Sequence, residues 1–120
     1  SLFGQQAQDA ANVWQKAHNL VLIVYNFAGK FPKSERCGIV LRLKESVMAI
    51  PIHIARGFMR RSPGEKENAY KDAQDALIGV NYYIELAISL GYLKEDALLA
   101  DTVDELGRML NGLVRSAKNA

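Results

Sequence analysis

Apolar residues recur along this chain at spacings of three and four, the period of one face of an α-helix. The first such stripe ends near Gly29, which a proline, Pro32, follows closely, as is typical of a helix end. Residues 1–11 are small and polar and carry no apolar period, so we expect a flexible N-terminal arm there. The stripe itself predicts a helix over about residues 12–29, with core residues Val13, Ala17, Leu20, Val24 and Phe27, widened by Trp14, Val21, Tyr25 and Ala28.

The second segment, about residues 35–61, is apolar on nearly every side. Ser34 is placed to cap its start, and Pro51 lies inside it, which predicts a bent helix because proline removes one backbone hydrogen bond. The row expected to face the core is Val40, Leu43, Val47, Ile50, Ile54 and Phe58. A second row exceeds what the interior of a four-helix bundle covers. We expect it to contact another subunit, the alternative being a wide core face, and its members are Leu41, Met48, Ile52 and Met59.

The clearest local signal is Ser62-Pro63-Gly64-Glu65. A serine N-cap, a proline at the first helical position and a glutamate at the third are typical of a helix start. They predict a third helix over residues 63–90, with Gly91 suited to a left-handed C-cap. A fourth helix is expected over residues 95–117, with the apolar stripe Leu99, Val103, Leu106, Leu110 and Leu113.

Short loops make successive helices antiparallel neighbours. The pattern therefore predicts an all-α fold, an antiparallel up-down-up-down four-helix bundle with a proline-kinked second helix, over residues 12–118. The 120 residues suffice for one domain, and 49% of them are hydrophobic. A single cysteine, Cys37, excludes an intramolecular disulfide. Because no run of about 18 apolar residues is present, we expect a cytoplasmic protein without membrane association.

The net charge of +2 does not indicate general binding of polyanions, so any nucleic-acid site must be a local patch. On a helical wheel, His53, Arg56 and Arg60 share one face. Since arginine suits bidentate phosphate contacts, the candidate nucleic-acid-binding residues are Arg42, His53, Arg56, Arg60, Arg61 and Lys66. The alternative is that these cations are solvated, or paired with Glu65, Glu67 or acids of a neighbouring subunit.

The residues do not support an enzyme. A di-iron carboxylate bundle needs Glu-x-x-His pairs, whereas Gln15 stands three residues before His18 and Ile50 three before His53. Cys37 has no nearby histidine or second cysteine that would activate it as a nucleophile. We therefore expect a non-enzymatic protein with no catalytic residue, no metal site and no cofactor.

Several runs resemble the four-helix-bundle proteins encoded by intervening sequences of bacterial large-subunit ribosomal RNA genes. They are Val13 to His18, Phe31 to Arg36, Ser46 to Gly57, Leu90 to Leu93 and Gly107 to Leu113. The resemblance implies a bundle that assembles into a ring, usually a homopentamer, with no established enzymatic activity. The chain is also similar to the accessory variability determinants of diversity-generating retroelements, which bind a reverse transcriptase and nucleic acid. RNA, or a protein acting on RNA such as a reverse transcriptase, is therefore the expected partner.

The chain departs from the family pattern at one place. The usual Pro-Ala-Asn-Ile-Ala-Glu-Gly reads Pro51-Ile52-His53-Ile54-Ala55-Arg56-Gly57 here. A contact that the family makes through the replaced asparagine and glutamate therefore has different chemistry in this protein. Together, the patterns predict a non-enzymatic, oligomeric, RNA-associated scaffold, with a protein-interaction scaffold lacking nucleic-acid affinity as the alternative.

Overall fold

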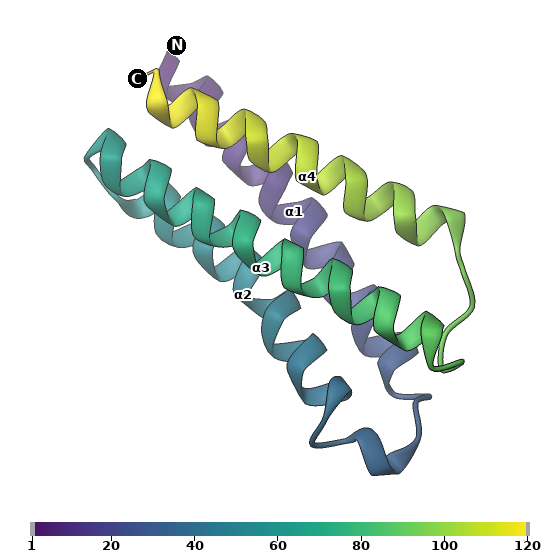
Figure 1. The fold of residues 1–120 in the computed structure, drawn as a ribbon. Coiled ribbons are helices and arrows are strands. Elements are labelled where there is room, and N and C mark those ends of the chain that lie inside the picture. Colours follow the sequence, from purple (N-terminus) through teal and green to yellow (C-terminus); the bar gives the residue numbers. More distant parts are fainter. Residues whose placement is uncertain (1, 120) are drawn as a thin grey trace.

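Four α-helices and no strand make up the part of the chain that the computed structural model describes, the backbone of residues 2–119 and the side chains of residues 4–119. Each helix contacts its neighbours in sequence, and α4 also contacts α1, so the four close into a bundle (Figure 1). Both chain ends and the α2–α3 turn lie at one end of this bundle. The predicted all-α four-helix bundle is confirmed, and its elements are α1 (Leu2–Ala28), the 3₁₀ helix η1 (Lys33–Glu35), α2 (Ile39–Met59), α3 (Pro63–Ser89) and α4 (Ala97–Lys118).

The predicted apolar stripes form the interior, with one clear exception. Fully buried side chains on these stripes include Leu20, Leu43, Ile50 and Leu110. Phe58 was expected in the same row, but its side chain is 38% exposed. The groove beside it is lined from α1 by Trp14, Gln15 and three alanines, at positions 7, 10 and 11, and the alanines are too small to cover a phenyl ring.

Pro51 lies inside α2 and is buried there. Proline carries no N–H, so the carbonyl of Val47 lacks its usual partner one turn later, yet the helix continues for two more turns. Burial of the flanking residues Ile50 and Ile54 against the other helices offsets this loss. The expectation of one continuous helix through Pro51 is confirmed.

The N-terminal segment differs from its prediction, because α1 begins at Leu2 and includes the residues expected to form a flexible arm. Ser1 lies outside the described residues. Side-chain hydrogen bonds between residues four apart stabilise this first part of the helix: Gln5 donates to Asp9 at 2.9 Å and Gln8 to Asn12 at 3.0 Å. The inner side of this part is alanine, and Ala10 is buried. Alanine is a strong helix former but a weak apolar signal, which explains why periodicity missed it.

The start of α2 also differs from its prediction, since the helix begins at Ile39 and not at residue 35. Ser34 lies within η1, and Gly38 occupies the N-cap position of α2. Glu35 accepts a hydrogen bond from the hydroxyl of Tyr92 at 2.9 Å, which raises the pKa of that hydroxyl. This contact ties η1 to the α3–α4 loop, so Glu35, the first residue of the predicted second helix, serves a tertiary contact instead.

The remaining helix ends follow the local signals closely. Ser62 Oγ accepts from the backbone N–H of Glu65 at 3.1 Å, as expected for an N-cap. Gly91 has φ of 79°, and the N–H groups of Gly91 and Tyr92 close a Schellman motif on the last carbonyls of α3. α4 begins two residues later than predicted, because Asp96 is its N-cap and accepts from the N–H groups of the first turn.

Replacing Ser62 with alanine tests the cap at the α2–α3 turn. We expect Ser62→Ala to lower the free energy of unfolding by about 1 kcal/mol, because an N–H group of the first turn of α3 loses its acceptor. Ser62→Asp keeps an acceptor and should retain most of the stability. Urea denaturation followed by circular dichroism measures both, and equal stability of Ser62→Ala and the wild type would show that the cap contributes nothing.

Candidate functional site

The six predicted nucleic-acid-binding residues lie in different environments. Arg42 is exposed near the start of α2 and lies 3.9 Å from the carboxylate of Glu45. Arg60 and Arg61 are exposed in the α2–α3 turn and form no ion pair with any described residue. Arg56 contacts α3, Lys66 contacts the end of α2, and His53 is half-buried on α2. The structure therefore divides the predicted cationic stripe instead of presenting it as one free surface.

His53 and Arg56 are half-buried on α2, three residues apart. Arg56 forms an ion pair with Asp72 of α3, and only 35% of its side chain is exposed. Nδ1 of His53 and Nε of Arg56 are both buried without a hydrogen-bond partner among the described residues. Arg56, which stands where the resemblance implies a glutamate, thus joins two helices of one chain, and its charge is partly neutralised there.

Lys66 stabilises the C-terminal end of α2. Its Nζ donates to the backbone carbonyls of Gly57 and Phe58 at 3.1 and 2.8 Å, and lies 5.5 Å from the centre of the Phe58 ring. Cations at this end of a helix complement its dipole and satisfy carbonyls that lack partners within the helix. Partial burial lowers the pKa of the Lys66 ammonium group.

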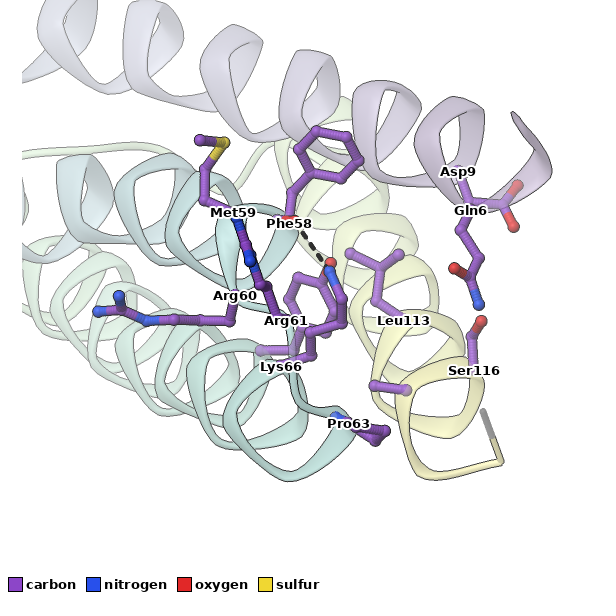
Figure 2. A pocket seen from close by; sticks show the side chains of 12 residues that line it. Gln6, Asp9, Phe58, Met59, Arg60, Arg61, Pro63, Lys66, Leu113 and Ser116 are labelled. Carbon is purple, nitrogen blue, oxygen red and sulfur yellow. Dashed lines mark hydrogen bonds between the residues drawn. The ribbon is translucent and has the colours of Figure 1, made fainter. Parts of the chain in front are cut away.

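A cavity of about 460 Å³ opens at the end of the bundle, where the α2–α3 turn meets the start of α1 and the end of α4 (Figure 2). We call it the end cavity. Its apolar walls include Phe58, Met59, Tyr70 and Leu113. Its polar lining falls into two sets. Arg60, Arg61 and Lys66 come from the turn and α3, whereas Gln6, Asp9 and Ser116 come from α1 and α4.

Large apolar side chains are exposed along the outer side of α1 and α2. The hydroxyl of Tyr25 lies 3.3 Å from Sδ of Met48, and Trp14 lines a groove together with Ala55 and Phe58. These contacts join the two helices into one surface, which we call the α1–α2 face. Ile52 and Met59 are the most exposed of its members, at 62% and 75%. The face consists of Trp14, Tyr25, Leu41, Met48, Ile52, Phe58 and Met59.

All four residues predicted to contact another subunit are therefore exposed, and the structure adds three aromatic residues to them. Trp14 and Tyr25 were expected to widen the core stripe of the first helix. Their positions, one residue after the core residues Val13 and Val24, place them beside that stripe, toward α2. This offset was the available signal in the sequence, but only the position of the neighbouring helix distinguishes a wide stripe from a second surface.

A second, smaller apolar surface lies on the opposite side of the bundle. Ile78 and Tyr82 of α3 are 68% and 61% exposed. Ile78 lines a groove of about 680 Å³ between α3 and α4, where Gly107 contributes no side chain and most of the other lining residues are polar or charged, Asp75, Asp104 and Arg108 among them. We call Ile78, Tyr82 and this groove the α3–α4 face.

Comparison with known proteins agrees with the resemblance seen in the sequence. A family model described as "23S rRNA-intervening sequence protein" matches residues 9–112. The chain belongs to this family. A crystal structure of a protein with unknown function, from the S23 ribosomal protein family of Bacteroides thetaiotaomicron VPI-5482, has the same fold, with a TM-score of 0.81. The match covers 89% of this chain and 98% of that one at 14% sequence identity. No curated protein matches the chain significantly.

At 14% sequence identity, the likeness to the S23-family structure shows the fold alone. Neither description indicates an enzymatic activity. Among the described residues, no three His, Cys, Asp or Glu side chains are grouped so that they could hold a metal ion. None of the described helices has the length and hydropathy that a membrane span requires. The end cavity and the two apolar faces are therefore the features from which a function can be argued.

Proposed function

We propose that this family member is a non-enzymatic scaffold whose subunits associate through the α1–α2 face. The observation that carries this proposal is the set of seven large apolar side chains exposed along two adjacent helices. A monomeric protein rarely exposes a contiguous apolar surface of this kind, because its hydration is unfavourable. Three of the seven side chains are aromatic and two are methionine, residue types that are enriched at interfaces with protein partners.

The ring that the family resemblance implies requires two different surfaces on each subunit. A cyclic assembly with an odd number of copies is built from head-to-tail contacts, in which one surface meets a different surface of the next copy. Helices α1 and α2 form one side of this bundle, and α3 and α4 form the other. We therefore expect the α1–α2 face of one copy to pack on the α3–α4 face of the next, in a homopentamer.

Introducing a charge into each face tests this arrangement. Ile52→Glu and Ile78→Glu should each reduce the oligomer to smaller species, because a carboxylate would be buried without a partner in the contact. Leu98→Glu is the matched control, since Leu98 is 73% exposed in the first turn of α4, outside both faces. This control should leave the assembly unchanged. Size-exclusion chromatography with light scattering measures all three variants.

Mixing the two disruptive variants separates a head-to-tail contact from a symmetric one. Each variant keeps the surface that the other has lost, so an equimolar mixture should form a dimer of twice 13.3 kDa through the one intact contact. If the α1–α2 face instead paired with itself, Ile78→Glu would assemble like the wild type. That result would contradict the head-to-tail arrangement while keeping self-association.

Nucleic-acid association is the second candidate function, and a specific observation favours it. Arg60 and Arg61 are exposed beside the end cavity and are not paired with any described carboxylate. Unpaired arginines at a cavity suit phosphate groups. Protein purified at low salt should carry nucleic acid, seen as an elevated ratio of absorbance at 260 to 280 nm that falls at high salt. A ratio that is the same at both salt concentrations would count against this function.

A further inference from the structure

We infer that the end cavity holds one unpaired nucleotide of a single-stranded nucleic acid, with its base inside the cavity and its phosphates on the arginine side. This inference rests on the nucleic-acid association proposed above and names its site. The site is complete within one subunit, because the described residues that line the cavity come from all four helices of one chain, although Phe58 and Met59 also belong to the α1–α2 face. It also goes beyond a cationic stripe on α2, because most of the cavity lies outside that helix.

The walls of the end cavity suit a planar aromatic ring. Phe58 is 38% exposed at its mouth, and Tyr70 and Leu113 form the apolar surface behind it. Nucleobases stack on exposed aromatic side chains in proteins that bind single strands. The volume of about 460 Å³ lies within the usual range for small-molecule sites, roughly 300–1,000 Å³. A single base with its sugar therefore fits, whereas a stacked base pair inside a duplex has no face free to enter.

The charges of the end cavity suit the phosphates of the same nucleotide. Arg60 and Arg61 are adjacent and exposed, and Figure 2 shows Arg60 on the opposite side of the view from Gln6 and Ser116, extending away from them. An ammonium group has three N–H donors, and Lys66 uses two of them on the carbonyls of α2. Its third donor remains for a phosphate oxygen. The lining contains three cations and one carboxylate, that of Asp9, so the net charge of the cavity favours an anion.

The side of the end cavity away from the arginines carries groups that match the polar edge of a base. The Gln6 amide both donates and accepts, the Ser116 hydroxyl does the same, and Asp9 accepts. Figure 2 shows Gln6 and Ser116 on the same side of the cavity. A simple anion such as inorganic phosphate would use only the cations, and an alkyl chain would use only the apolar walls. A nucleotide uses all three parts of the lining.

The first test compares single-stranded oligonucleotides with and without bases, by fluorescence anisotropy on the wild-type protein. The probes are labelled strands of about eight nucleotides, as RNA, as DNA and as an abasic strand of equal charge. We expect an intact RNA or DNA strand to bind at least about fivefold more tightly than the abasic strand, from base stacking. Equal affinity for intact and abasic strands would overturn the cavity site but keep nucleic-acid association. No binding of any strand at low salt would overturn both.

The second test places the site with variants. Arg61→Ala should weaken binding of the intact strand several-fold and reduce its salt dependence, because one phosphate contact is lost. Ser116→Phe should weaken it by filling the cavity without changing any charge. Arg36→Ala is the matched control, since Arg36 is an exposed arginine between η1 and α2, at the other end of the bundle and outside the cavity lining. Equal losses for Arg61→Ala and Arg36→Ala would overturn the site, because binding would then follow net charge alone. If Ser116→Phe does not fold, as judged by circular dichroism, Gln6→Ala takes its place and should also weaken binding.

Discussion

Replacing Leu110 with alanine is expected to lower the free energy of unfolding by about 2–5 kcal/mol. Leu110 lies on α4 with its side chain fully buried, in the core that all four helices share. Truncation removes buried methyl groups and leaves a cavity that the packed helices fill only in part. Since a domain of this size is typically stable by only about 5–15 kcal/mol, this single change removes a large share of its stability.

Leu98→Ala is the matched control for this core substitution. Leu98 lies on the same helix but is 73% exposed, so the same truncation there should change stability by no more than about 0.5 kcal/mol. Urea denaturation of both variants at one protein concentration provides the comparison, because self-association makes apparent stability depend on concentration. Similar losses for the two variants would show that α4 does not pack as described.

Replacing Gly57 with alanine is expected to destabilise the bundle by a net amount of about 1–2 kcal/mol. A Cβ atom on Gly57 would lie 2.5 Å from Cε1 and 2.7 Å from Cδ1 of Tyr70, and the Tyr70 ring is buried. Overpacking of this kind costs about 1–3 kcal/mol, which exceeds the gain of up to about 1 kcal/mol in helix propensity. Removing the ring in the double variant with Tyr70→Leu should cancel part of the loss, as a double-mutant cycle would show.

Gly112→Ala is the matched control on α4. A Cβ atom at Gly112 meets nothing within 4 Å, and the residue is exposed inside the helix. Only the gain in helix propensity from glycine to alanine applies there, so this variant should be more stable than the wild type by about 0.5–1 kcal/mol. Opposite signs at the two glycines are the expected result of thermal or urea denaturation. A stabilising Gly57→Ala would contradict close packing of Tyr70 on α2.

Much of the fold could be predicted because each helix buries one regular stripe. Leu99, Val103 and Leu106 show this directly, since their spacing of four and three matches the inner side of α4. Local chemistry also made the ends of α3 predictable, because Ser62 caps the first turn of the helix and Gly91 adopts the positive φ that ends it. These signals depend only on residues close in sequence.

The parts of the fold that differ from the sequence prediction depend on residues that are distant in the sequence or on contacts without an apolar period. Phe58 continues the spacing of the core row, but the small residues of α1 beside it leave its ring exposed. Glu35 suited the first turn of a helix, but Tyr92 uses its carboxylate. The start of α1 was missed because its inner side is alanine and its stabilising contacts are side-chain hydrogen bonds, not apolar periodicity.

The candidate sites could be predicted only in part for the same reason. The exposed row on α2 followed from an excess of apolar residues over what one bundle covers. The carboxylate that pairs with Arg56 could not be predicted from the sequence, because Asp72 lies sixteen residues away along the chain and on another helix. Arg61 shares the end cavity with Gln6 and Ser116, from opposite ends of the sequence. No spacing rule along one helix brings such residues together.

The most direct measurement of self-association is the molar mass of the wild-type protein by light scattering at micromolar concentration. Association through the α1–α2 face predicts a mass that is a multiple of 13.3 kDa, five-fold for the homopentamer, and a fall toward 13.3 kDa for Ile52→Glu. A wild-type mass of 13.3 kDa at this concentration would contradict the proposed scaffold.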